Sequence, residues 1–189
     1  NQLKFLHTNV RNKVEKIAIK IKNKMLDLLK DTYKDMWVVF DLDGTIANIE
    51  SRRKLATKDG GKLDWDIFFE PKNIKLDKPF IKIITLANMF KNIGVNIAIL
   101  SGRSKSTKEE TQKWLKLHNV PYHILKMRPT SKEWKFMPDD KLKEIWLEDL
   151  WPEHERDGKL FMVFDDRQKV VDMWRKNKVT CLQVAEGNF

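Results

Sequence analysis

The sequence lacks several features that would assign it to a familiar class of protein. It has a single cysteine, Cys181, which excludes an internal disulfide and predicts an intracellular, reducing compartment such as the cytoplasm or an organelle. No apolar run approaches the roughly 20 residues that a membrane-spanning helix needs. The four histidines, at positions 7, 118, 123 and 154, have no metal-ligand spacing, and we interpret them as structural. Internal repeats and low-complexity tracts are also missing.

A nucleotide-binding P-loop and an acidic excess are missing as well. Gly61-Lys62-Leu63 lacks the upstream glycine and the Ser or Thr of a P-loop. The 37 Lys and Arg residues outnumber the 27 Asp and Glu residues, giving a net charge of +10. A surface this basic favours polyanionic partners, because its cations contact phosphates and release counterions. The alternative is that the lysines reflect only coding composition and solubility.

Apolar strands alternate with amphipathic helices along most of the chain. Strands are predicted at 37–42, 95–100, 122–127, 160–164 and 179–184, and helices at 80–91, 107–118, 138–150 and 170–176. Gly94 indicates the end of the first of these helices, and Thr107 with Glu110 resembles a capping box. This alternation predicts an α/β domain with a mostly parallel central sheet and right-handed crossovers.

Two segments stand outside this alternation. Residues 1–36 are predicted to form an appended basic amphipathic helix, capped by Thr8 or Asn9. We expect its apolar stripe to pack on the sheet, whereas docking to nucleic acid or a partner is the alternative, and both can hold. The stripe comprises Val14, Ile17, Ile21, Met25 and Leu28 or Leu29, among Lys13, Lys16, Lys20, Lys22, Lys24 and Lys30. Residues 47–77 form a short insertion, too small for a large lid.

Carboxylates follow two of the predicted strands. Asp41 and Asp43 end the first strand, and Asp165 and Asp166 end the fourth. Parallel strands end at one edge of a sheet, so we expect these four and Ser101 to converge there. Four carboxylates in one pocket need a cation, and oxygen ligands favour Mg²⁺. The alternative for the first pair is an Asp-Gly turn that Asp43 caps.

These motifs resemble the haloacid dehalogenase (HAD) superfamily of phosphotransferases. DLDGT matches the first motif of the family, and the strand that ends in Ser101-Gly102-Arg103 matches the second. Lys143 in DDKLKEI falls at the position of the motif lysine, and LFMVFDDR matches the last motif. The resemblance implies a HAD-like Rossmannoid three-layer sandwich over residues 37–189, with a minimal cap insertion at 47–77.

The resemblance also implies roles for these residues. Asp41 would attack phosphorus and form an aspartyl-phosphate, Asp43 would act as acid and base, and Lys143 is the third implied catalytic residue. The implied Mg²⁺ ligands are Asp41, Asp43, Asp165 and Asp166, and which of the last two binds directly stays open. Without the resemblance, Lys143 is a solvated surface lysine, Arg103 pairs with a surface acid and Asp166 caps the following helix.

A narrower resemblance, from Trp37 to Phe189, is to the 3′-phosphatase domains of the phage polynucleotide kinase/phosphatase family. The matching segments are DLDGTIANIESRR, WDIFF, SGRSKSTKEETQKWL, the MRP segment, PDDKLKE, FDDRQKVVDMW and CLQVAEGNF. Guanidinium groups bind phosphate bidentately, and Asp140 would orient Lys143 or an arginine. The implied phosphate-binding residues are Thr45, Arg52, Ser101, Gly102, Arg103, Arg128, Asp140 and Arg167.

The resulting functional prediction is a Mg²⁺-dependent polynucleotide 3′-phosphatase that acts on DNA or RNA ends. The alternatives are a HAD-fold nucleic-acid-binding subunit of a larger assembly with little or no catalysis, and a phosphatase for small metabolites. Because no P-loop kinase accompanies the motifs, we do not expect 5′-phosphorylation from this chain. Expected partners are 3′-phosphorylated ends together with a separate kinase or ligase, or a larger nucleic-acid-containing assembly.

Overall fold

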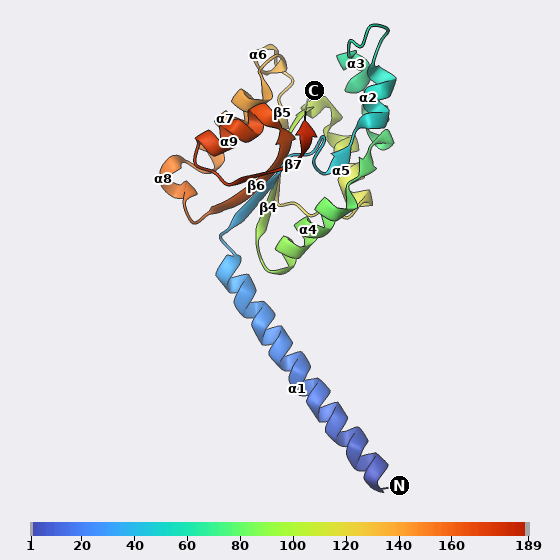
Figure 1. Ribbon diagram of the computed structural model, residues 1–189, viewed down its shortest axis with the longest axis vertical. Helices are drawn as coiled ribbons and strands as arrows, with labels where there is room; N and C mark the ends of the chain where they lie inside the picture. Colours follow the sequence, from blue (N-terminus) through green and yellow to red (C-terminus); the bar gives the residue numbers. More distant parts are fainter. Residues whose placement is uncertain (1, 188–189) are drawn as a thin grey trace.

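A computed structural model describes residues 2–187, with side chains from residue 10 onward (Figure 1). Asn1, Asn188, Phe189 and the side chains of Thr8 and Asn9 therefore lie outside the described part. A five-stranded sheet forms the centre, in the order β5-β4-β1-β6-β7, and every pairing is parallel. The strands are β1 (Trp37–Phe40), β4 (Asn96–Ser104), β5 (Ile124–Arg128), β6 (Leu160–Arg167) and β7 (Cys181–Gly187). The predicted parallel sheet is confirmed.

Helices cover both faces of the sheet. The first face carries α4 (Ile81–Asn92) and α5 (Lys108–Leu117), and the second carries α7 (Asp139–Leu150) and α9 (Gln168–Lys176) (Figure 1). Side chains alternate along β1, so Val38 and Phe40 enter the core under α4 and α5, while Val39 enters the core under α7 and α9. Phe40 stacks on Phe164 of β6, with ring centroids 4.7 Å apart. The predicted three-layer sandwich is therefore confirmed.

The insertion after β1 is folded rather than loose. Its two ends pair as antiparallel strands β2 (Ala47–Asn48) and β3 (Lys78–Pro79). Between them lie α2 (Glu50–Ala56), α3 (Trp65–Phe68) and the 3₁₀-helix η1 (Pro71–Leu76). Further short elements are η2 (Lys105–Thr107), α6 (Lys132–Lys135) and α8 (Glu153–Arg156). Because the pair β2–β3 joins the ends of the insertion, the insertion forms one wall beside the sheet.

Strands β4, β6 and β7 continue three or four residues beyond their predicted carboxyl ends, and their pairings are irregular there. The pairing of β4 with β5 shifts register between Ser101 and Ser104, and that of β6 with β7 shifts between Asp165 and Arg167. Such irregularities re-aim side chains at the end of a strand. The predicted capping box is wrong, because the Thr107 hydroxyl donates to the Ser104 carbonyl at 2.8 Å instead of capping α5.

The N-terminal helix α1 (Gln2–Tyr33) extends away from the sheet, at the edge opposite the carboxyl ends of the strands (Figure 1). The predicted packing of its stripe on the sheet is wrong, because Val14, Ile17, Ile21, Met25 and Leu28 are 56–67% exposed. The predicted caps are wrong too, since the helix begins well before Thr8. Contact with the domain occurs near its C-terminal end, where the Lys30 backbone lies against Gly94 and Tyr33 packs on the core. Within residues 2–187, no helix combines the length and apolarity needed to cross a membrane.

Candidate active site

The loop that follows β1 is a tight turn at the carboxyl edge of the sheet. The amide of Asp41 donates to the Phe164 carbonyl of β6 at 2.9 Å, which continues the sheet by one residue. Gly44 then adopts a positive φ of 91°, and its amide donates to the Ala47 carbonyl at 2.9 Å. A Cβ atom at position 44 would lie 2.2 Å from the Asp166 carboxylate. Position 44 therefore requires glycine for two reasons: other residues rarely adopt this φ, and their Cβ atom would clash with Asp166.

Three buried carboxylates meet at this edge. Asp41, Asp165 and Asp166 each present an oxygen within 4.8 Å of the others. Lys143, buried on α7, donates to Asp41 Oδ1 at 2.5 Å and to Asp165 Oδ2 at 2.8 Å. Burial acts to lower the pKa of the lysine, but Asp165, Asp41 and Asp139 outweigh it and raise that pKa. A charged ammonium thus lies among the carboxylates, so Lys143 is not the solvated surface lysine of the alternative interpretation.

The carboxylate cluster fits a divalent cation bound through oxygen. Asp166 Oδ2 is buried and has no hydrogen-bond partner, while Thr45 donates to Oδ1 of the same group at 3.3 Å. Burial, reinforced by Asp165, raises the pKa of Asp166 to about 6. Burial also raises the pKa of Asp41 well above its usual value, despite the opposing charge of Lys143. A cation would satisfy the orphaned oxygen and relieve the repulsion, and Mg²⁺ prefers such ligands.

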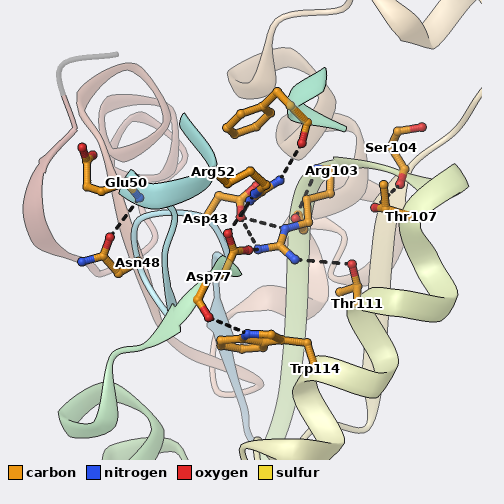
Figure 2. A network of polar contacts seen from close by, with 12 residues as sticks. Asp43, Asn48, Glu50, Arg52, Asp77, Arg103, Ser104, Thr107, Thr111 and Trp114 are labelled. Carbon is orange, nitrogen blue, oxygen red and sulfur yellow. Dashed lines mark hydrogen bonds and ion pairs between the residues drawn. The ribbon is translucent and has the colours of Figure 1, made fainter. Parts of the chain in front are cut away.

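Asp43 does not join this cluster, which corrects the predicted convergence of four carboxylates. Its Oδ1 accepts from Arg52 Nη2 at 2.7 Å, from Arg103 Nε at 2.7 Å and from Arg103 Nη2 (Figure 2). Burial acts to raise the pKa of Asp43, but Arg103 and Arg52 outweigh it and hold that pKa below its ordinary value. The two carboxylates of the first motif therefore point into different electrostatic surroundings.

Arg52 and Arg103 are fully buried and bind a second carboxylate that sequence reasoning missed. Asp77, which follows η1, accepts from Arg52 Nε at 2.9 Å and from Arg103 Nη2 at 2.6 Å (Figure 2). The Asp77 carbonyl accepts from the Trp114 indole at 3.0 Å, which fixes the position of the aspartate. The alternative in which Arg103 pairs with a surface acid is therefore wrong, because its partners are the largely buried acids Asp43 and Asp77. Its contact with the substrate phosphate stays a prediction. No local sequence pattern marks Asp77.

A second missed residue, Asp139, holds the other two predicted arginines. Its Oδ1 accepts from Arg128 and its Oδ2 from Arg167. The structure gives this position to Asp139 rather than to the predicted Asp140, because α7 begins at residue 139. Asp139 and Lys143 lie four residues apart and therefore on one face of α7. This spacing in the sequence would have indicated that Asp139 lies near the motif lysine.

The remaining predicted phosphate-binding groups lie at the same edge. The buried Ser101 hydroxyl accepts from the Arg103 amide at 3.2 Å, and the buried Thr45 hydroxyl binds Asp166. Gly102 lies against Asp139, where an added Cβ would come within 2.6 Å of the carboxylate. Arg128 also donates to the Gly102 carbonyl at 3.1 Å. Apart from Asp140, each predicted phosphate-binding residue thus lies at this edge, though many of the side chains are engaged by protein groups.

A cleft of about 780 Å³ opens over these residues. Asp41, Asp43 and Lys143 lie in it beside Gly102, Arg128 and Arg167. One wall is Trp65–Pro71 of the insertion, and the other is the segment from Arg128 to Asp139. The volume falls in the range of ligand-binding clefts. Its acidic centre and basic rim suit a phosphate ester whose negative charge is compensated by a lysine, arginines and a cation.

Comparison with known proteins agrees with this geometry. The family described as "Polynucleotide kinase PNKP phosphatase domain" matches residues 35–189. A chain in the "Structure of Pnkp1/Rnl/Hen1 complex" is similar with 27% identity and a TM-score of 0.62, over 82% of this chain and 47% of that chain. A chain in the "Structure of the Pnkp1/Rnl/Hen1 RNA repair complex" has 27% identity and a TM-score of 0.61, over 82% and 43%. This chain thus spans less than half the length of either.

A more distant likeness concerns the fold alone. A predicted phosphatase from Clostridium acetobutylicum is 16% identical with a TM-score of 0.59, over 78% of this chain and 83% of that chain. At this identity the agreement reports the three-layer architecture and not the substrate. The family match over residues 35–189, together with the fold, agrees with the HAD resemblance that the motifs indicated.

Proposed function

We propose that this chain, which belongs to the family of polynucleotide kinase PNKP phosphatase domains, removes the 3′-phosphate from the end of a DNA or RNA strand. The observation that carries the proposal is Asp41, buried against Lys143 at the floor of an open cleft in a chain of net charge +10. We assign the catalytic domain to residues 37–189 and treat residues 1–36 as an appended helix.

Asp41 is the proposed nucleophile. One of its oxygens forms a bond to phosphorus while the bond from phosphorus to the 3′-oxygen of the strand breaks, giving an aspartyl-phosphate. Lys143, 2.5 Å from Asp41 Oδ1, favours the ionised carboxylate that this attack needs. The same ammonium compensates charge on the phosphoryl oxygens as they approach. A lysine here thus serves both the nucleophile and the transferred group.

Asp43 is the proposed proton donor and acceptor. It protonates the departing 3′-oxygen, then accepts a proton from the water that attacks the aspartyl-phosphate and releases inorganic phosphate. All three of its hydrogen bonds to Arg52 and Arg103 end on Oδ1, so the exchanged proton belongs to Oδ2. The side chain is 15% exposed and lines the cleft. The arginines lower its pKa, which favours the second, base-catalysed half of the reaction.

Asp41, Asp165 and Asp166 would hold Mg²⁺. When bound there, the cation supplies Lewis-acid stabilisation of the negative charge on the phosphoryl group. The unpaired Oδ2 of Asp166 makes this residue the stronger candidate for direct ligation, while Asp165 is already engaged by Lys143. Thr45 orients Asp166, and Gly44 leaves room for it.

A nucleic acid end is the proposed substrate. The insertion stands beside the cleft, so a polymer end can enter while the rest of the strand stays outside. Arg128 and Arg167 line the same cleft as Asp41 and would meet the phosphates of the strand. Both similar complexes are Pnkp1/Rnl/Hen1 complexes, and one is described as an RNA repair complex. An RNA end is therefore the first substrate to test, and nucleic acid end repair is the expected setting.

The test is phosphate release from matched substrates in the presence of Mg²⁺. A 3′-phosphorylated RNA, its DNA counterpart, the 5′-phosphorylated RNA and a panel of small phosphate esters are compared on one preparation. The proposal expects turnover of the 3′-phosphorylated strands well above that of the other substrates. Equal or faster turnover of small esters would indicate a metabolite phosphatase.

One alternative has an observation in its favour. The exposed basic helix α1 suits a nucleic-acid-binding subunit with little or no catalysis. Binding of the RNA without phosphate release from any substrate would support that alternative. An Asp41→Asn preparation serves as the background in both assays.

A further inference from the structure

Two large aromatic side chains remain exposed on opposite walls of the active-site cleft. Trp65, at the start of α3, is 55% exposed, and Phe136, just after α6, is 78% exposed. Both line the cleft that holds Asp41 and Lys143. Single exposed aromatics are common on protein surfaces, whereas two that line one cleft give it the kind of lining that ligand sites have. The proposed chemistry on phosphate uses neither of them.

Trp65 has a rigid support. Its ring stacks on Phe69 with centroids 5.7 Å apart and an interplanar angle of 18°, and it meets Phe68 edge-on at 5.7 Å. Phe68 in turn lies over the Arg52 guanidinium, 4.2 Å from ring centroid to Cζ. Asp64 caps α3 by accepting from two of its amides, at 3.0 and 3.2 Å. The indole is therefore held in place by a stack that reaches the residues around Asp43.

The opposite wall combines an aromatic ring with a cation. Lys135 lies 5.6 Å from the centroid of the Phe136 ring, and both residues line the cleft. Arg128, from the start of the same wall, donates to the carbonyls of Trp134 and Met137 at 2.7 and 2.6 Å. These bonds fix the short helix α6 beside the catalytic floor. Aromatic rings interleaved with cations are the composition of surfaces that bind single-stranded nucleic acid.

We propose that Trp65 and Phe136 form a stacking subsite for the nucleobases next to the 3′-phosphate of a single-stranded end. The inference rests on the proposed function and names the substrate class more closely. Every nucleobase has a flat π-face, so stacking binds without regard to sequence. In a duplex, each base is stacked between its neighbours and held by edge-to-edge pairing with the opposite strand, so it must be unpaired and unstacked before its face can meet a protein ring. The subsite therefore makes the enzyme prefer single-stranded over paired ends, with Lys135 near the strand backbone.

The test uses two single-stranded 3′-phosphorylated oligonucleotides of equal length. One carries normal nucleosides at its last two positions, and the other carries abasic residues there. For Trp65→Ala we expect KM to rise roughly tenfold on the normal strand, within the range that base stacking supports. The rise is confined to the strand that has bases, and kcat changes little. Trp65→Phe should restore most of the affinity, and Phe136→Ala should show the same pattern more weakly.

Controls separate this inference from the proposed function. Phe161 on β6 is 47% exposed and does not line the cleft, so Phe161→Ala should leave both KM values unchanged. Equal KM values for the two strands in the wild type, or an equal rise on both strands in Trp65→Ala, would overturn the stacking subsite while leaving the phosphatase intact. If the wild type releases no phosphate, the proposed function fails. Fluorescence anisotropy with the same strands still decides the subsite, since only the normal strand should lose affinity in Trp65→Ala.

Discussion

A single residue separates Asp41 from Asp43 in the chain, yet the surroundings of the two carboxylates are opposite in charge. Asp41 lies with Asp165, Asp166 and Lys143, and burial raises its pKa well above the usual value. Asp43 lies between two arginines that outweigh its burial and lower its pKa. Two identical side chains thus acquire different properties from their neighbours, which is how one motif can supply both a nucleophile and a proton carrier.

The neighbours of the two carboxylates also come from different parts of the fold. The partners of Asp41 belong to β6 and α7, which are elements of the central sandwich. Those of Asp43 include Arg52 of the insertion, and Asp77, also of the insertion, holds Arg52 and Arg103 in place. The first half of the site depends on the sheet, and the second depends on how the insertion is anchored. Substitutions around Asp41 and substitutions around Asp43 should therefore cause different kinds of defect, and defects of different size.

The largest expected effect is that of Asp41→Asn. An amide cannot replace the carboxylate as a nucleophile, so kcat should fall by more than about a hundredfold, while RNA binding is largely kept. Single-turnover phosphate release and fluorescence anisotropy measure the two quantities on one preparation. Residual turnover above a hundredth of the wild-type value would rule out the covalent route through Asp41.

Removal of divalent cations should abolish turnover and should also be visible in stability. A cation that binds only the folded state raises Tm by mass action, so Mg²⁺ should raise the Tm of the wild type. In Asp166→Asn one like charge is gone, and we expect a higher Tm without Mg²⁺ and a smaller response to its addition. Differential scanning fluorimetry with and without EDTA reads this directly. Full activity in EDTA would show that the carboxylate cluster does not bind a cation that catalysis needs.

The ion pairs of Asp43 can be disrupted separately from those of Asp41 by the substitution Arg103→Ala. This change leaves Asp77 and Asp43 without their shared guanidinium in a buried place, and we expect a loss of roughly 3 kcal/mol in unfolding free energy. Urea denaturation gives the value. Arg11→Ala, on the exposed face of α1, is the matched control and should show no measurable change. Loss of activity at unchanged stability would instead favour direct contact of Arg103 with the substrate phosphate.

The smallest effect on catalysis is expected from the basic face of α1. Replacing Lys13, Lys16, Lys20, Lys22 and Lys24 by Gln should weaken binding of a long RNA and reduce the slope of log affinity against log salt. Turnover of a dinucleotide 3′-phosphate should stay the same. The helix α1 lies at the edge opposite the carboxyl ends of the strands (Figure 1), whereas Asp41 and the other residues that line the cleft lie at the carboxyl ends. An unchanged salt slope would mean that these lysines do not contact the polymer.

Local patterns were sufficient to predict the sheet, its flanking helices and the carboxylates at the strand ends. Each of those predictions depends on residues close together in the chain, such as the apolar run before Asp41 or the strand before Asp165. The periodicity of α1 predicted a helix, and an apolar face, correctly. The periodicity did not determine whether the rest of the chain covers that apolar face. Amphipathicity describes the helix alone and does not identify the surface on which the helix packs.

Partners that are distant in sequence could not be predicted in this way. Asp77 becomes a site residue only when the insertion folds against Arg103, and nothing near position 77 indicates that contact. Asp139 was missed by one residue, since the choice between adjacent aspartates depends on where α7 begins. Trp65 and Phe136 are separated by about a third of the chain and share a cleft only through the tertiary fold.

The anchoring of the insertion limits how the protein can select its substrates. Arg52 and Asp77 both belong to this wall, and swinging it outward would separate fully buried charges from Arg103 and Asp43. We therefore expect the wall to stay in place during turnover instead of opening and closing as a hinged lid. For the nucleic acid proposed as substrate, discrimination would then depend on the width of the passage that admits a strand end. The rest of a long strand would stay outside the cleft while its terminus is processed.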